Sequence, residues 1–131
     1  MVSALAQNTL RELELFTLMY CANVLIIGEI PRSARDDVLH TMKRHTGFGM
    51  FHAQRSAAFD LPSHRNVVLV LDDACELSSD HQVRLLEWVS RNHVQIVSFA
   101  SRSLYAMVCA EKFIDRLYYQ LNTVCIIAGD S

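Results

Sequence analysis

A run of five apolar residues, Val67-Val-Leu-Val-Leu71, is the feature that most constrains how this chain can fold. A short run that is apolar at every position is typical of a strand buried on both faces of a parallel sheet. Similar apolar runs predict further strands at residues 23–28, 94–99 and 123–128, and a weaker one at 50–55. Amphipathic segments between them predict helices at 3–20, 33–45, 79–91, 102–110 and 112–120.

Two of these helices carry recognisable end signals. We expect Ser33 to cap the helix at 33–45, with Asp36 and Asp37 in its first turn and Gly47 and Gly49 at its end. Ser78 or Ser79 is expected to cap the helix that runs to Arg91. That helix has Val83, Leu86 and Val89 on one apolar face, with Leu85 and Trp88 beside it.

Strands that alternate with helices imply right-handed crossovers and a three-layer α/β fold with a mostly parallel, five-stranded sheet. The 131 residues predict a single domain, 1–131, large enough to bury roughly two-thirds of its unfolded surface. An apolar content of 51% with only four Gly and two Pro excludes a disordered chain. The net charge of −2 argues against a globally basic nucleic-acid binder.

The cysteines and the chain start predict a cytoplasmic protein. Cys21, Cys75, Cys109 and Cys125 are interpreted as buried free thiols, and neither they nor the histidines have the spacing of a metal site. No run is long enough to span a membrane, and residues 1–10 do not resemble a signal peptide.

Residues 32–65 hold six Lys and Arg against three Asp, together with four of the six His. This stretch is either a solvated surface or a contact surface for a partner, and the sequence leaves both open.

Three predicted strands are followed by polar or glycine residues: Gly28-Glu29, Asp72-Asp73 and Ala100-Ser101. The carboxyl ends of parallel strands meet at one edge of the sheet, where ligands of open α/β folds bind. We therefore expect these pairs to lie close together.

Several segments match, in order and spacing, one family. Residues 113–122 resemble FREDLYYRLN, residues 69–77 resemble LFLDEIGEL, residues 82–86 resemble QAKLL, residues 94–102 resemble VRIIAATNR, and residues 24–29 resemble the start of VLITGESGTGKE. The chain thus resembles the AAA+ domain of the sigma-54-dependent transcription activators. The resemblance implies a P-loop NTPase-like core and, in the family, binding of ATP and magnesium.

The phosphate loop departs from the family pattern. Pro31 replaces a glycine and has no N–H, Ser33 replaces the second glycine, and Ala34 stands where the family has lysine, with Arg35 next to it. We therefore expect no cofactor. The resemblance assigns a vestigial nucleotide-binding role to six residues: Gly28, Glu29, Arg35, Asp72, Asp73 and Ser101.

Other parts of the family's catalytic machinery are also changed. Asp73 replaces a longer Glu, so we expect Asp72 and Asp73 to cap a helix or bind an arginine instead. Ser101 replaces a sensor Asn, and Ile114 and Gln120 replace two arginines that reach the neighbouring subunit. The GAFTGA loop that touches the sigma factor is missing between the second and third strands, and no helical lid is expected because the sequence ends at Ser131.

The leading hypothesis is a sigma-54-interaction module of a bacterial transcriptional regulator that lacks ATPase activity and acts by protein contact. Its expected partner is sigma-54 RNA polymerase or a regulator subunit, possible homo-oligomers included, and DNA is reached only through another domain. A weak ATP-binding or ATP-hydrolysing domain of a sigma-54-dependent response regulator, using Arg35 and Asp73, is the alternative. A phosphoacceptor receiver with Asp72 at a strand end is a third possibility.

Overall fold

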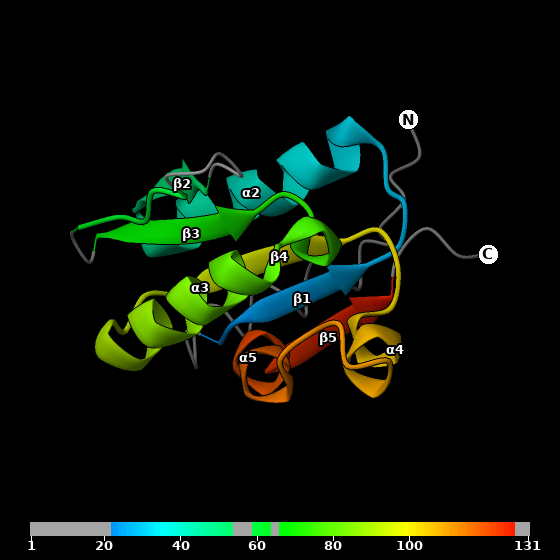
Figure 1. The fold of residues 1–131 in the computed structure, drawn as a ribbon. Coiled ribbons are helices and arrows are strands. Elements are labelled where there is room, and N and C mark those ends of the chain that lie inside the picture. The colour runs from blue at the N-terminus through cyan, green and yellow to red at the C-terminus, as the bar shows by residue number, and fades with distance from the viewer. Residues whose placement is uncertain (1–21, 54–58, 64–65, 128–131) are drawn as a thin grey trace.

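A computed structural model describes residues 22–53, 59–63 and 66–127. Its centre is a five-stranded sheet in the order β2-β3-β4-β1-β5, with every pair of neighbours parallel (Figure 1). The strands are β1 (Val24–Ile27), β2 (Gly49–His52), β3 (Val67–Leu71), β4 (Ile96–Ala100) and β5 (Val124–Ile127). The predicted fold class is confirmed, and the strand ends lie within two or three residues of the expected ones.

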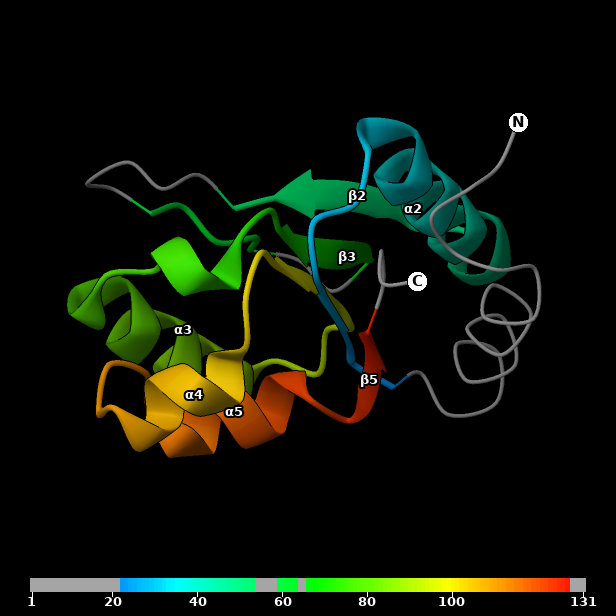
Figure 2. The ribbon, with the colours of Figure 1, turned by 90° about the vertical axis from the view of Figure 1, so that its right-hand side faces the viewer.

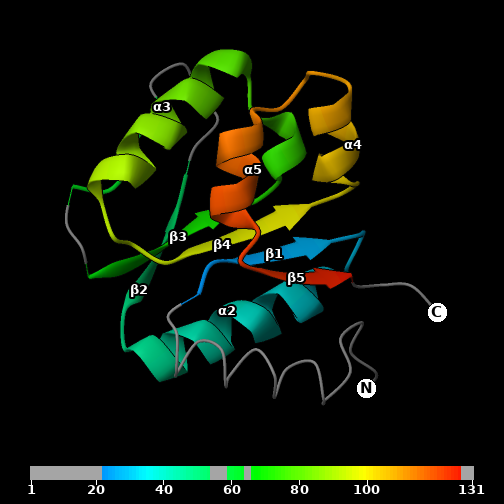
Figure 3. The same ribbon diagram turned by 90° about the horizontal axis from the view of Figure 1, so that it is seen from below.

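Helices cover both faces of this sheet (Figure 3). Helix α2 (Arg32–Thr46) lies on one face. The other face carries α3 (Ser79–Arg91), α4 (Leu104–Cys109) and α5 (Asp115–Leu121), and a short 3₁₀ helix, η1 (Ala74–Glu76), follows β3. The helix predicted at 3–20 lies outside the described residues.

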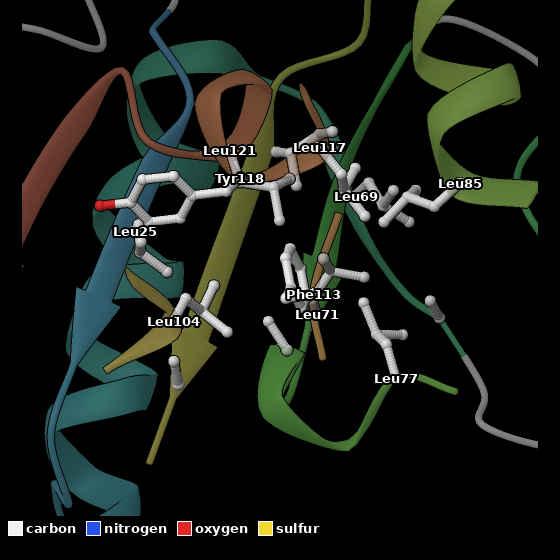
Figure 4. Packing of buried hydrophobic residues seen from close by; sticks show 14 of the residues in the cluster. Leu25, Leu69, Leu71, Leu77, Leu85, Leu104, Phe113, Leu117, Tyr118 and Leu121 are labelled. Carbon is white, nitrogen blue, oxygen red and sulfur yellow. The ribbon is translucent and has the colours of Figure 1, made fainter. Parts of the chain in front are cut away.

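Each face of the sheet has its own hydrophobic core. On the α2 side, alternate strand residues such as Val24, Ile26 and Phe99 pack with Val38 and Met42. On the other side, the core is larger, and leucine is its commonest residue. Figure 4 labels part of it: Leu25, Leu69, Leu71, Leu77, Leu85, Leu104, Phe113, Leu117, Tyr118 and Leu121. Burial on both faces explains why β3 is apolar at all five positions.

The strand order also decides one alternative. Here β1 lies between β4 and β5, the last two strands along the chain. A receiver domain has the order 2-1-3-4-5, in which the first strand lies between the second and third. The receiver interpretation of Asp72 is therefore wrong.

Helix α2 begins differently from the prediction. Pro31, with φ −65° and ψ 157°, occupies the cap position, and its carbonyl accepts the N–H groups of Ala34 and Arg35. The proline ring fixes φ at a value that suits a helix start, so the helix begins before Ser33 can act as its cap. Asp36 and Asp37 consequently fall beyond the first turn, which contains no acidic residue. The predicted stop at Gly47 is confirmed, with a left-handed φ of 73°.

Helix α3 keeps its predicted bounds, and the Ser78 hydroxyl accepts the N–H of His81 as a cap. Its buried face is different, because Gln82 and Leu85 are the buried residues whereas Val83 is 47% exposed. Trp88 is half-buried, and its indole N–H donates to the carbonyl of Pro62 at 3.1 Å.

The cysteine prediction is only partly right. Cys75 is a buried free thiol, but Cys109 and Cys125 are free and exposed; Cys21 lies outside the described residues. Cys125 lies on β5, which is an edge strand of the sheet and alternates between half-buried and exposed residues. Within the described residues, no helix is long and apolar enough to cross a membrane.

Candidate functional site

The strand ends bring most of the predicted site residues to one edge of the sheet. Figure 2 looks onto the carboxyl ends of the strands, where the turns after β1, β3 and β4 come together. The N–H of Gly28 donates to the carbonyl of Ala100 at 2.8 Å, which joins two of these turns directly. Gly28 has a φ of 124°, a conformation that favours glycine over every other residue.

The turn from Gly28 into α2 contains the positions that the sequence resemblance assigns to a phosphate loop. Pro31 supplies no N–H at the cap of α2, and Ala34, at the position of the family's lysine, is fully buried and carries no charge. Glu29 is exposed at the start of this turn. The described turn therefore lacks two groups that a phosphate loop uses, a backbone donor and an ammonium group.

Arg35 has a defined place in the site. Its Nη1 donates to the backbone carbonyl of Asp72 at 2.8 Å, and its guanidinium carbon lies 4.6 Å from the centre of the Phe99 ring. The first contact satisfies a carbonyl at the end of β3, and the second is a cation–π contact with β4. One side chain thus ties the start of α2 to the ends of two strands.

The carboxylate of Asp72 faces another direction. Its Oδ1 lies 3.0 Å from Nδ1 of His52, the last residue of β2. The two side chains are 53% and 41% exposed, so the contact is largely solvated and is an ion pair only when the imidazole is protonated.

Asp73 is held by backbone groups. Its Oδ1 accepts the N–H of Cys75 at 3.0 Å, as the cap of η1, and the N–H of Ser101 at 3.3 Å. The expectation that these carboxylates cap a helix or bind an arginine is confirmed for Asp73, which caps η1. The carboxylate of Asp72 contacts His52 instead, and Arg35 reaches the backbone carbonyl of Asp72. Ser101 enters the site through its backbone and lies at intermediate exposure.

The thiol of Cys75 lies beside this cluster. Its Sγ donates to the carbonyl of Arg102 at 3.3 Å. Burial raises the pKa of Cys75 above its usual value, and the nearby carboxylate of Asp73 adds to the shift. The thiol therefore stays protonated, which makes it a poor nucleophile at neutral pH.

The two positions at which the family has subunit-bridging arginines lie away from this edge. Ile114 caps α5 and its N–H donates to Oε1 of Gln82 at 2.9 Å, whereas Gln120 is exposed near the end of α5. No group of three metal-ligating side chains occurs among the described residues.

Two residues that sequence reasoning did not single out belong to the site, His52 and Phe99. In the sequence, Phe99 looks like any other apolar residue of a buried strand. The comparison with VRIIAATNR could have singled it out, because that run has alanine at the position of Phe99. A small residue there would leave the guanidinium of Arg35 without its aromatic surface.

A sequence model of the sigma-54 interaction domain matches residues 3–128. The chain belongs to the sigma-54 interaction domain family. No match of significance was found among curated proteins. The structural relatives of this sigma-54 interaction domain confirm the fold.

Two solved structures illustrate this relationship. NtrX from Brucella abortus in complex with ATP superposes with a TM-score of 0.74 at 14% identity, covering 97% of this chain and 36% of NtrX. The P-loop NTPase domain of the sigma-54 transport activator from E. coli gives a TM-score of 0.61 at 17% identity, covering 92% of this chain and 94% of that one. The sigma-54 interaction domain described here therefore spans about a third of the length of NtrX.

Proposed function

We propose that this sigma-54 interaction domain works without hydrolysing ATP and acts through protein contact in a bacterial transcriptional regulator. The contacts of Arg35 with Phe99 and Asp72 carry the proposal, because they engage this cation with groups of the protein itself. NtrX from Brucella abortus forms a complex with ATP. In this chain the residues present do not fit a nucleoside triphosphate with magnesium.

The misfit concerns both the phosphates and the magnesium ion. Two groups that would bind the phosphates are missing: a lysine at position 34, where the chain has Ala34, and a backbone N–H at position 31, where it has Pro31. The carboxylate of Asp73 is engaged by two backbone N–H groups, and that of Asp72 contacts His52. Magnesium prefers oxygen ligands such as these two carboxylates. To bind them, the ion would have to displace the contacts that each carboxylate already makes.

The alternative, weak hydrolysis by Arg35 and Asp73, requires both side chains to leave their present partners. Arg35 would give up a charge-assisted hydrogen bond and a cation–π contact, and Asp73 would uncap η1. These losses support the non-catalytic proposal. A phosphate-release assay at saturating ATP and magnesium tests it: no release above a buffer blank is expected, and release that disappears in Asp73→Ala would establish the alternative.

For the protein contact, sigma-54 RNA polymerase is the partner that the family relationship favours, with a second regulator subunit or copy of this chain as the other choice. The contact would take place in the bacterial cytoplasm. The test immobilises the full chain. We expect it to retain sigma-54 in the absence of nucleotide. Retention that requires ATP would contradict a contact independent of hydrolysis.

A further inference from the structure

A hollow of about 530 Å³ lies between the start of α3 and the turn that joins α4 to α5, apart from the site at the strand ends. Its volume falls within the range of roughly 300–1,000 Å³ that is usual for ligand pockets. Both elements contribute to its walls: Ser79, Gln82 and Val83 from α3, and Val108 with residues 111–115 from the other side.

Part of this hollow is apolar although it is open to solvent. Val83 is 47% exposed, and Val108 and Ile114 are half-buried. The helical spacing predicted Val83 on the buried face of α3, yet the cores of the protein leave its side chain uncovered. These three side chains offer a place for one aliphatic side chain of a ligand.

The floor of the hollow is held in shape by hydrogen bonds. The Nε2 of Gln82 donates to the carbonyls of Leu77 and Lys112 at 3.1 and 3.2 Å, and its Oε1 accepts the N–H of Ile114 at 2.9 Å. Gln82 is 2% exposed and the adjoining Phe113 is 4% exposed. Because these bonds fix the two walls relative to each other, little conformational entropy is lost when a ligand binds.

Glu111 lies on the rim in a backbone conformation that favours glycine, with a φ of 61°. Its N–H donates to the carbonyl of Val108 at 3.0 Å, and the N–H of Lys112 donates to that of Met107 at 2.8 Å. Glycine is the commonest residue at this position of such a helix-ending turn. The fold therefore accepts a loss of stability that places a carboxylate beside the hollow.

The rim carries more negative than positive charge. Among the described residues that line it, Glu111 and Asp115 are exposed carboxylates, and Lys112 contributes one ammonium group. Residues 74–83, which lead into the first wall and form it, include two acidic residues and no Lys or Arg. A cationic ligand is therefore complementary to this surface.

We propose that this hollow binds a short basic segment of a partner protein, with one aliphatic side chain against Val83 and Ile114 and a Lys or Arg beside Glu111 and Asp115. The apolar contact supplies affinity, and the charges select the partner. A polyamine would use the carboxylates alone, whereas a basic peptide uses both features of the hollow. The inference rests on the protein contact of the proposed function, whose surface it locates, and does not depend on the loss of hydrolysis.

The test is an NMR titration of the full chain with three pentapeptides. The first has leucine between lysine and arginine, with a glycine at each end. The second has glycine in place of the leucine, and the third has glutamate in place of both basic residues. We expect saturable shifts with the first peptide alone, the amides of Val83 and Glu111 among them.

Variants of the chain locate the binding. Glu111→Gln should weaken binding of the first peptide about threefold, because one exposed charge pair is lost. Asp36→Asn, which neutralises an exposed carboxylate of α2 on the opposite face of the sheet, should leave binding unchanged. Glu111→Gly should weaken binding as Glu111→Gln does while raising the thermal midpoint, since glycine suits this backbone. Val83→Arg should abolish binding, because it places a like charge in the apolar part of the hollow.

Three results would overturn the inference: no binding of the first peptide, equal binding of the second or third, or equal binding by Glu111→Gln. A dimer of the chain in sedimentation that Val83→Arg dissociates would also overturn it and assign the hollow to a second copy. An immobilised chain that retains sigma-54 but binds none of the peptides would show this surface to be wrong and the proposed contact to be right, so the two failures are distinguishable.

Discussion

The guanidinium of Arg35 lies 4.6 Å from the centre of the Phe99 ring while its Nη1 reaches the carbonyl of Asp72. Arg35 comes from the first turns of α2, shortly after the turn that follows β1. The cation of this residue therefore bonds to groups of the protein itself. Stability, and not catalysis, is the property that this residue should control.

Replacing Arg35 by Ala should lower the free energy of unfolding by about 2 kcal/mol, because a hydrogen bond from a charged donor and a cation–π contact are both lost. Urea unfolding followed through Trp88, the chain's one tryptophan, measures this change. Arg32→Ala, on the exposed side of the same helix start, is the matched control and should cost less than about 0.5 kcal/mol. Equal effects of the two variants would show that the contacts of Arg35 contribute nothing specific.

Gln82 should matter more than its polar character suggests. It is 2% exposed, its Nε2 donates to the carbonyls of Leu77 and Lys112, and its Oε1 accepts the N–H of Ile114. Gln82→Ala leaves these three backbone groups without a partner, so we expect a loss of about 2 to 3 kcal/mol in thermal or urea unfolding. Gln120→Ala, at an exposed position, should be nearly neutral; a neutral Gln82→Ala would refute the role of these bonds.

Stability should fall at alkaline pH through Cys75. Burial raises the pKa of this thiol in the folded state above its ordinary value of 9.0. The folded protein then holds the proton more tightly than the unfolded chain, so this contribution is complete below about pH 9 and is lost as the pH rises toward the folded-state pKa. Unfolding measured from pH 8 to 10 should show a shallower decline for Cys75→Ala than for the wild type. Parallel curves would contradict the assignment.

Phe59 should anchor the segment before β3. It is fully buried and stacks on the ring of His81 with centres 4.4 Å apart. Phe59→Ala should cost about 3 to 4 kcal/mol by leaving a cavity. The fluorescence of Trp88, whose indole is bonded to Pro62 in the same segment, should shift to the red. Phe48→Ala, at an exposed phenylalanine, should change neither; an unshifted Trp88 in Phe59→Ala would contradict this anchoring role.

The sheet could be predicted from the sequence because its strands are buried on both faces. Val67–Leu71 matches β3 at both ends, since the apolar run and the strand have the same cause. The gathering of Gly28, Asp72, Asp73 and Ser101 followed from the geometry of parallel strands alone.

Other features depended on tertiary partners that spacing does not reveal. The buried face of α3 includes Gln82 because three backbone groups satisfy its amide, which an apolar pattern cannot indicate. Pro31, two residues before Ser33, takes the cap position that the sequence assigned to Ser33. The contact of Arg35 with Phe99 joins residues 64 positions apart by sequence number and could be recognised only in the structure.

The most direct test of the central claim is a calorimetric titration of the full chain with ATP and magnesium, beside a variant whose residues 30–35 are replaced by the family run SGTGKE. We predict no binding heat for the wild type, because Pro31 and Ala34 remove phosphate contacts and Arg35 is bonded to the protein. The variant should gain binding if the loop is what was lost. Micromolar binding of ATP by the unaltered chain would contradict the account.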